Sequence, residues 1–327
     1  MKKQILFGLI VLLLALPSAQ AAKKDAPLYF PPAKGQWEKI DPAKIGWNPS
    51  KLKELMDYAG KNKSSGVVIL YRGRILAEQY WPLDPKEKTA AGKPNPYFHM
   101  RLGKNTKGRA IEDVASAQKS VTAMLVGIAQ HKGLLKITDP VHKHLGKGWS
   151  KAPAAAEAKI TIRHLITMSS GLNARLQFVA PAGTKWFYNT GAYSKALTCV
   201  SKAAKMDANE LTKKWLTGPL GMKDSRWAVR PWQTSVRTDA NRYGFATTAR
   251  DLARFGIGER LAAAIGGERG ASVERGRGGL GGERRGGQEP GSRHRRDAGG
   301  AQSAHRARLL SCCLWASARR GRLRPCR

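Results

Sequence analysis

The sequence predicts an α/β fold of the α+β type, in which an antiparallel hairpin precedes a largely helical middle. Two strand-like apolar runs, at residues 67–71 and 75–80, flank a short turn that contains Gly73, and this pattern is typical of a hairpin. Apolar residues then recur with helical periodicity at 116–130 and at 191–215. With 327 residues, 42% of them hydrophobic, the chain is long enough to bury a sizeable core.

The first 21 residues have the pattern of a cleaved signal peptide. A start with two lysines is followed by an apolar run at residues 5–16 and by the small-x-small sequence Ala19-Gln20-Ala21. The apolar run is shorter than the roughly 20 residues that cross a bilayer as a helix. We therefore expect an exported protein, periplasmic or secreted, whose mature chain begins at Ala22 and keeps no stable membrane anchor.

Between the signal sequence and the helical middle, irregular and regular segments alternate. Residues 22–46 are rich in Pro, Lys and Trp without a sustained period, and we expect them to form an arm on the domain surface. The apolar pattern at 52–59 predicts a helix with Ser50 as its N-cap. The polar stretch at 84–110 predicts a loop that leads towards the functional site.

The helical pattern that begins at Ser116 carries the strongest candidate for a catalytic pair. A serine hydroxyl loses its proton as it attacks, so a nucleophilic serine needs a base within hydrogen-bond reach. Ser116 and Lys119 are three residues apart, which places them on one face of a helix. The N-terminus of that helix would also favour a developing oxyanion. A lysine accepts a proton only when it is neutral, a state that burial or nearby positive charge favours.

A Ser-x-x-Lys spacing alone is a weak signal in a lysine-rich chain, and a solvated helix face is the alternative. Here an apolar stripe follows the pair, which indicates a buried helix. The surrounding residues 113–121, DVASAQKSV, resemble the nucleophile motif of the beta-lactamase-related serine hydrolases. That group includes class C beta-lactamases, DD-peptidases, esterases and 6-aminohexanoate-dimer hydrolases.

Five further stretches resemble this family in the expected order. They are GLLKITDPV from Gly133, ITIRHLITMSSGL from Ile160, PAGTKWFYNTGAY from Pro181, GPLGMKDSRW from Gly218 and GFATTARDLARFG from Gly244. Together with the nucleophile motif they cover roughly residues 47–256, and their shared order argues against coincidence. The resemblance implies a helical region packed on one antiparallel sheet that includes the N-terminal hairpin. It also implies acyl transfer to water without a metal or organic cofactor, and a small-molecule or peptidoglycan-like substrate with an ester, amide or beta-lactam carbonyl.

The family's second motif is Tyr-x-Asn, whose tyrosine works with the lysine in moving protons. Tyr188 matches it, while Thr190 stands where many members have asparagine, a variant closer to the esterase and amide-hydrolase branches. The resemblance implies that Tyr188 is catalytic and that Asn189, Thr190 and Trp186 contact the substrate. Tyr193 is the alternative tyrosine, and packing of the Tyr188 or Trp186 ring is the non-catalytic alternative.

The family's third motif, a Lys-Thr-Gly or His-x-Gly run on the strand that lines the site, should follow Phe255, and the sequence does not contain it. His294 and His305 lie in that region, but no strand-like run follows either. The strand donates one N–H of the oxyanion hole, and loss of one such donor costs on the order of a hundredfold in turnover. We therefore expect the C-terminal strands to be missing and the activity of this chain to be reduced or lost.

Other site types have less support in the sequence. No Gly-x-Ser-x-Gly elbow occurs, which disfavours an α/β-hydrolase. His142 and His144 lack metal-ligand spacing, and His164 is assigned to packing at the start of a helix expected at 160–168. Ser169-Ser170-Gly171 is interpreted as the turn that ends this helix, and Cys199 as a packed small hydrophobe.

Residues 256–327 differ in composition from the rest of the chain. They hold 16 arginines, no lysine and six acidic residues, a net charge of +10, and the body carries the remaining +25 of the total of +35. We interpret them as a disordered tail produced by a single-base shift in a GC-rich gene. The alternative is a genuine Arg/Gly-rich module that binds nucleic acid or an anionic surface.

Export, and a break inside the last family motif, favour the frameshift interpretation, so we expect no nucleic-acid partner. Residues 47–255 then form a truncated hydrolase-like domain. A non-catalytic peptidoglycan-binding relative and an exported protein with an anion-binding tail are the functional alternatives.

Overall fold

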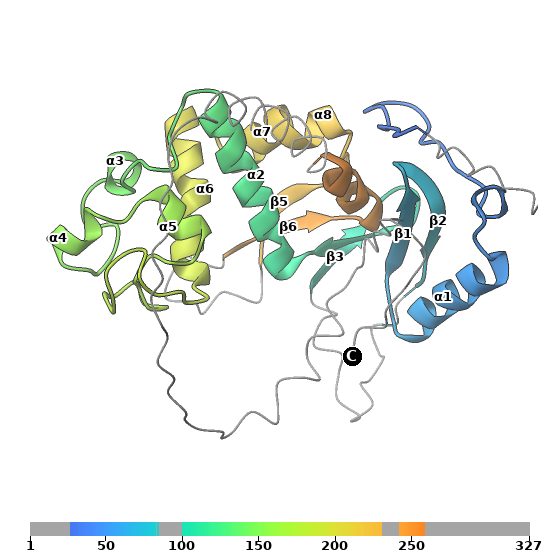
Figure 1. Ribbon diagram of the computed structural model, residues 1–327, viewed down its shortest axis with the longest axis horizontal. Coiled ribbons are helices and arrows are strands. Elements are labelled where there is room, and N and C mark those ends of the chain that lie inside the picture. The colour runs from blue at the N-terminus through green and yellow to red at the C-terminus, as the bar shows by residue number, and fades with distance from the viewer. Residues whose placement is uncertain (1–26, 83, 85–99, 231–241, 259–327) are drawn as a thin grey trace, which may run out of the picture.

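The computed structural model describes residues 27–82, 84, 100–230 and 242–258, in which a helical part packs against antiparallel strands (Figure 1). This arrangement confirms the predicted α+β class. The signal peptide and nearly all of the Arg/Gly-rich tail lie outside the described residues. The elements are, in chain order, η1 (Ala43–Ile45), α1 (Pro49–Lys61), β1 (Gly66–Tyr71), β2 (Arg74–Tyr80), β3 (Arg101–Lys104), β4 (Ala110–Asp113), η3 (Ala115–Ala117), α2 (Gln118–His131), α3 (His142–Leu145), α4 (Ala154–Glu157), α5 (Ile162–Ile166), α6 (Thr190–Ala204), α7 (Ala208–Thr212), the π-helical turn η4 (Lys213–Thr217), α8 (Gly218–Leu220), β5 (Arg226–Val229) and β6 (Tyr243–Thr247). A last helix spans residues 249–258.

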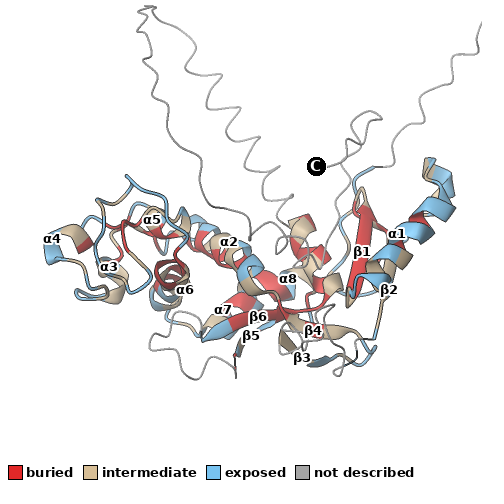
Figure 2. Cartoon of the chain, turned by 90° about the horizontal axis from the view of Figure 1, so that it is seen from below, coloured by how far each residue is buried: buried red, intermediate tan, exposed pale blue. Residues whose placement is uncertain are grey.

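The predicted hairpin is present as strands β1 and β2, joined by Arg72 and Gly73. Both turn residues have positive φ, 47° and 89°, as a two-residue turn that matches the twist of a hairpin requires. Successive β1 side chains point to opposite faces. Val67 and Ile69 pack with helix α1, whereas the alternate residues 68 and 70 pack towards helix 249–258. The hairpin is therefore covered by a helix on each face, and Figure 2 shows β1 as buried.

The N-cap of helix α1 lies two residues earlier than the sequence suggested. This N-cap is Asn48, whose side-chain oxygen accepts a hydrogen bond from the Lys51 N–H at 3.1 Å, and Pro49 occupies the first helical position. The prediction of Ser50 as the cap is wrong because proline is favourable at that first position, where its missing N–H costs nothing.

Residues 27–46 run along the outer side of the hairpin. Ile40 donates its N–H to the Ile75 carbonyl at 2.9 Å, and Ile75 donates in turn to Glu38. The indole of Trp37 is buried and donates to the carbonyl of Gly73 at 2.8 Å. The described part of the predicted arm is thus tied to β2 by backbone bonds and by one buried aromatic ring.

Four short strands form a separate antiparallel sheet in the order β3-β4-β6-β5. The loop predicted at 84–110 is therefore partly wrong, because β3 lies within it and β4 begins at its last residue. Residues 85–99 of this loop lie outside the described ranges. Each of these strands has only four residues, and their sequences, RLGK and AIED, are too short and too polar to show a period of two. The sheet forms because some of its strands pair with strands that are distant in sequence, as β4 does with β6.

Among the described residues, backbone ladders do not join the hairpin to this sheet, contrary to the expectation of one sheet that includes the hairpin. Side chains make the connection instead. Glu78 on β2 pairs with Arg109 at 3.1 Å and with Arg250 of the last helix at 3.2 Å. The hydroxyl of Ser65 donates to the carboxylate of Glu112 on β4. Ion pairs and hydrogen bonds of half-buried side chains thus replace strand pairing at this junction.

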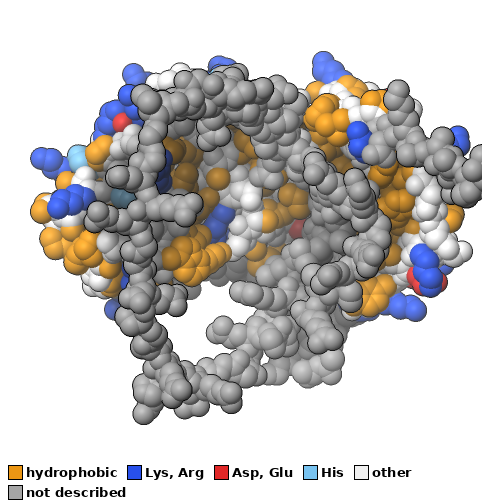
Figure 3. All heavy atoms as spheres, in the orientation of Figure 1, with side chains coloured by type: hydrophobic (Ala, Val, Ile, Leu, Met, Phe, Trp, Pro, Cys, Tyr) orange, Lys and Arg blue, Asp and Glu red, His pale blue; other side chains and the backbone are white. Residues whose placement is uncertain are grey.

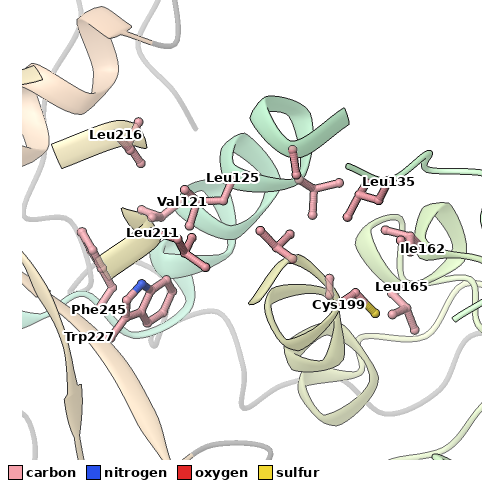
Figure 4. Close-up of a cluster of buried hydrophobic side chains, with 14 of the residues drawn as sticks. Val121, Leu125, Leu135, Ile162, Leu165, Cys199, Leu211, Leu216, Trp227 and Phe245 are labelled. Carbon is pink, nitrogen blue, oxygen red and sulfur yellow. The ribbon is translucent and has the colours of Figure 1, made fainter. Parts of the chain in front are cut away.

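The main hydrophobic core lies between the helices and the inner face of the four-stranded sheet (Figure 4). Val121 and Leu125 of α2 share this core with Leu211 of α7. The aromatic side chains of Trp227 on β5 and Phe245 on β6 belong to the same cluster. The two rings lie edge to face with centroids 5.1 Å apart, a favourable geometry. Because α2 is fixed between helices and sheet, the residues at its start are held rigidly.

The described surface is basic, in line with the charge of the sequence. Figure 3 shows Lys and Arg side chains around the rim of the molecule, with acidic side chains sparse on this face. Hydrophobic side chains are also exposed there. None of the helices in the described ranges has the length and apolar character that a membrane crossing requires.

A buried carboxylate in the last helix links the stability of the fold to pH. Asp251 is 4% exposed and accepts hydrogen bonds from the Asp224 N–H and the Ser225 hydroxyl, both at 2.8 Å. Burial raises the pKa of this carboxyl to about 6. Since an unfolded Asp has a pKa of about 3.9, the unfolded chain releases the proton first, and the native state loses stability as pH rises from 4 through 6.

We expect Asp251→Asn, which keeps an acceptor oxygen and cannot ionise, to remove this dependence. The stability of the wild type relative to the variant should fall by about 2–3 kcal/mol between pH 4 and pH 7. Urea unfolding of both proteins at unit pH intervals measures the difference. A difference that stays constant over this range would contradict the burial of an ionisable carboxyl at this position.

Candidate active site

Ser116 lies in a tight turn between strand β4 and helix α2. The turn η3 follows Asp113, the last residue of β4, and its first residue, Ala115, has a φ of +48°. Residues with a side chain rarely adopt this left-handed conformation, and such strain is held by surrounding contacts. The Asp113 carboxylate accepts a hydrogen bond from the Ala115 N–H at 2.8 Å. The turn presents the Ser116 hydroxyl to solvent directly before the start of α2, at the positive end of the helix dipole.

Lys119 lies one turn along α2, with its ammonium group directed back at the serine. Its Nζ donates to the Ser116 Oγ at 3.3 Å. The same nitrogen lies 4.9 Å from the centroid of the Tyr188 ring and 5.9 Å from that of Tyr193. Two aromatic faces therefore flank the amine, and the structure brings together the pair that the sequence spacing predicted.

Tyr188 approaches the same hydroxyl from a different part of the chain. Its phenol donates to the Ser116 Oγ at 2.6 Å, across 72 positions of sequence. Partial burial raises the pKa of this phenol, but hydrogen bonds with Lys119, Ser116 and Thr190 and the positive charge of Lys119 together lower it below its ordinary value. A phenol whose ionised form is favoured beside a serine hydroxyl can exchange a proton with it.

Tyr193 differs from Tyr188 in both position and environment. Its hydroxyl donates to the backbone carbonyl of Lys119 at 2.8 Å, and its ring is buried. Burial, and then the neighbouring Tyr188, raise the pKa of Tyr193 to about 12. Tyr193 thus holds the backbone of α2 at Lys119. The tyrosine that bonds to the Ser116 hydroxyl is Tyr188.

The segment before Tyr188 is bonded to the turn that ends helix α5. Phe187 donates its N–H to the Met168 carbonyl at 2.9 Å, and Gly183 donates to Ser169 at 2.7 Å. Gly171 has a φ of +72°, and a side chain there would overlap the carbonyl of Ala180. The stretch Ser169-Ser170-Gly171 therefore acts as a turn, as interpreted from the sequence, and it supports the loop that carries Tyr188.

Asn189 is buried and makes contacts within the fold, and substrate contact by this residue stays a prediction. It is 2% exposed, and its side-chain oxygen caps helix α6 by accepting from the Ala192 N–H at 3.0 Å. Its amide group donates to the carbonyls of Leu172 and Asn173, each at 2.9 Å. All of these groups are used within the fold because the residue joins the α6 N-terminus to the preceding loop. Asn189 anchors its neighbour Tyr188.

Thr190 and Trp186 lie on either side of this anchor. Thr190 is the first residue of α6, and its side chain forms a hydrogen bond with the Tyr188 phenol that favours the phenolate. Trp186 is 67% exposed, so it is not part of the core. Substrate contact by either residue stays a prediction.

The site also depends on residues that sequence reasoning did not single out. Arg230, which follows strand β5, forms a buried ion pair with Asp113 and donates to the Gln118 side chain at 3.2 Å. Gln118 in turn accepts from the Phe245 N–H at 3.0 Å. Arg230 is 117 positions from Asp113, and a single sequence offers no signal for such a pairing.

The other candidate residues have structural roles in the described ranges. His164 and Thr161 form a reciprocal cap at the start of α5, as its assignment to the helix start predicted. Cys199 is buried with no disulfide, and burial raises the pKa of its thiol to about 12. His144 pairs with Asp139 at 3.1 Å. Within the part of the chain that the structure describes, no cluster of three or more His, Cys, Asp or Glu side chains could hold a metal.

The chain is similar to a known protein family, to a curated relative and to several solved structures. The family model described as Beta-lactamase matches residues 50–304, a range that extends beyond Phe255. An uncharacterized protein of Alkalihalophilus pseudofirmus is 27% identical over 228 residues, which is 64% of this chain and 61% of that protein. This chain therefore spans less than two thirds of the length of that relative.

Similar solved structures include a D-alanine carboxypeptidase of Burkholderia cenocepacia, 22% identical with a TM-score of 0.44, for which 64% of each chain is covered. A beta-lactamase/D-alanine carboxypeptidase of Yersinia pestis is 24% identical with a TM-score of 0.38, and the match covers 44% of this chain and 52% of that one.

The anchoring role of Asn189 predicts a large cost for its removal. In Asn189→Ala, helix α6 loses its cap and two buried carbonyls lose their donors, which should destabilise the fold by about 2–4 kcal/mol. Asn48→Ala is the matched control, because Asn48 caps α1 in the same way but is exposed, and it should cost about 1 kcal/mol. Thermal unfolding of the three proteins measures both effects. Equal losses in the two variants would contradict the anchor.

Proposed function

Because the chain belongs to the Beta-lactamase family, we propose that it is an exported serine hydrolase that acts through an acyl-enzyme on an ester, amide or beta-lactam carbonyl. The fold of this family supports serine hydrolase activity in general. The finer assignment to this chain rests on the geometry around Ser116.

One observation carries the proposal: a single exposed hydroxyl accepts hydrogen bonds from both Lys119 and Tyr188. The two distances to Ser116 Oγ are 3.3 Å and 2.6 Å, the second within and the first near the reach that proton transfer needs. A serine with an adjacent base held in place by a third group is the arrangement of an activated nucleophile. An ordinary surface serine has no need of either partner.

The reaction follows from these three side chains. The Ser116 oxygen attacks the carbonyl carbon while its proton passes to the Tyr188 oxygen, whose ionised form is stabilised by the positive charge of Lys119. The tetrahedral intermediate then collapses, and the phenol returns the proton to the departing oxygen or nitrogen. A water molecule next attacks the acyl-enzyme, with the same pair accepting its proton, and Ser116 is regenerated.

The negative charge of the intermediate needs donors near the attacked carbonyl oxygen. The first contribution is the positive end of the α2 helix dipole, which lies beside Ser116 and favours negative charge there. In this family, a backbone N–H donor comes from a strand that is expected after Phe255. That region lies largely outside the described residues. We therefore propose that the present chain turns over more slowly than a chain with that strand, by on the order of a hundredfold.

The surroundings of the hydroxyl favour a substrate with an apolar part. Trp186, Phe187 and Tyr188 are consecutive in the chain, and each exposes more than two fifths of its surface. Thr190 in place of the more common asparagine supports an ester or amide in preference to a lactam. Small-molecule and peptidoglycan-like substrates both remain within this class.

The proposal predicts that a fluorophosphonate probe labels the protein at Ser116. Ser116→Ala should abolish labelling, because the attacking oxygen is gone. Ser120→Ala is the control: this exposed serine lies on the same helix, and its loss should leave the labelling rate within about twofold. Labelling is followed by intact-mass spectrometry. A folded wild-type protein that takes no label would favour a non-catalytic peptidoglycan-binding relative.

The two tyrosines should separate in their effect on rate and pH profile. Tyr188→Phe should lower kcat/KM for a p-nitrophenyl ester by about 10²–10⁴-fold, because a proton acceptor beside Ser116 is lost. In the wild type the rate should rise with pH along a limb whose midpoint lies below the ordinary phenol value of about 10, and the variant should lack this limb. Tyr193→Phe should keep the limb. If Tyr193→Phe removes it and Tyr188→Phe does not, the assignment is reversed.

A further inference from the structure

We infer that Arg230 is a positioning residue for the nucleophile, acting through Asp113 and Gln118 on the two sides of Ser116. This inference rests on the proposed function, since it assigns a residue to the same reaction. Arg230 contacts Asp113 and Gln118, and through them it acts on the backbone turn that presents the serine.

The contacts of Arg230 bracket Ser116 in the sequence. Its Nε and Nη2 donate to the two carboxylate oxygens of Asp113, the latter at 2.9 Å, and Nη2 also donates to the Gln118 Oε1 at 3.2 Å. Asp113 lies three residues before Ser116, and Gln118 lies two residues after it. One planar guanidinium therefore fixes the distance between the end of β4 and the start of α2.

A second hydrogen bond accepted by the Asp113 Oδ1 atom explains why this distance matters. The Oδ1 atom that accepts from Arg230 also accepts from the Ala115 N–H at 2.8 Å. Ala115 has the left-handed φ of +48°, a conformation that persists only where the surroundings determine it. The ion pair thus holds the strained residue directly before the nucleophile, and the strain sets the direction of the Ser116 side chain.

Strand β6 completes the frame around this ion pair. The Phe245 carbonyl accepts from the Val114 N–H, and the Phe245 N–H donates to Gln118, both at 3.0 Å. Gly244, one residue earlier, has no side chain, and a Cβ atom there would overlap the Asp113 carboxylate and approach Arg230 within 2.7 Å. The sheet therefore leaves room for the ion pair at this point and bonds to the residues on both sides of the nucleophile turn.

Stability alone is a weak explanation for this arrangement. The side chains of Arg230 and Asp113 are 6% and 0% exposed, and desolvation of two charges offsets much of their attraction. Replacing such a pair with apolar residues is often neutral for stability, whereas fixing one geometry is a use for which buried ion pairs are known. The half-buried pair of Arg109 with Glu78 differs in position, because Arg109 precedes β4 and Asp113 ends that strand.

The test compares Arg230→Met with Arg109→Met, which removes a half-buried ion pair elsewhere in the full-length chain. With a p-nitrophenyl ester, assayed well below each melting temperature, Arg230→Met should lower kcat by ten- to a hundredfold with KM within about threefold, because a misplaced nucleophile slows the chemical step. The pH limb due to Tyr188 should keep its midpoint. Arg109→Met should lower the melting temperature while kcat stays within about twofold.

A second measurement keeps the inference testable without activity. Hydrogen exchange of the peptide that holds residues 113–118 should quicken at least tenfold in Arg230→Met relative to the wild type, with peptides of α6 unchanged. Arg230→Lys retains the charge but not the bidentate geometry, so its exchange rate should lie between those of the wild type and Arg230→Met. It replaces Arg230→Met in the test if that variant fails to fold.

The outcomes separate the two proposals. A wild type without esterase activity contradicts the proposed function, and exchange then decides the role of Arg230 on its own. Unchanged exchange at 113–118 in a folded Arg230 variant overturns the inference. So does an active Arg230→Met protein that loses thermal stability but keeps its kcat.

Discussion

Two side chains from distant parts of the chain donate hydrogen bonds to the same serine hydroxyl, and most of the described structure is arranged around this constraint. Lys119 reaches Ser116 from one turn further along α2, whereas Tyr188 comes from a loop 72 positions away. The first contact needs only a helix, because residues three apart share a face. The second needs a fixed relation between two packed units of the fold.

The helical core and the loop anchors provide that relation. Helices α2 and α6 pack against each other in the main core, so the residues at their N-terminal ends are held at a set separation. Tyr188 precedes α6 by two residues, and the buried amide of Asn189 bonds that junction to the loop at 172–173. On the other side, the turn before Ser116 is bonded to the sheet. The catalytic proposal therefore depends on backbone segments that buried polar groups hold in place.

Sequence reasoning predicted the parts of this arrangement that local pattern or motif resemblance encodes. The hairpin followed from two apolar runs around a short turn, and the long helices followed from a periodicity of about 3.6. The pair Ser116 and Lys119 followed from its spacing. Tyr188 was identified by resemblance, and the structure places its hydroxyl beside that of Ser116. These features depend on residues that are close in sequence or on motifs that resemble those of a known family.

The features that sequence reasoning missed depend on contacts between distant residues. Strands β3 and β4 are too short and polar to show a pattern, and they exist because β6 pairs with β4. The anchoring contacts of Asn189 were not predicted, because its position in the motif does not reveal the carbonyls to which its amide donates. The ion pair of Arg230 with Asp113 joins residues 117 positions apart, and no local rule predicts it.

Identification of the covalent intermediate tests the account most directly. The wild-type chain is mixed with a slowly hydrolysed ester or with benzylpenicillin, quenched in acid, and mapped by peptide mass spectrometry. We predict a single acyl adduct on the peptide that contains Ser116, with fragmentation placing the added mass on that serine. Hydrolysis of the substrate without any adduct, or an adduct on another side chain while Ser116 stays free, would contradict the central claim.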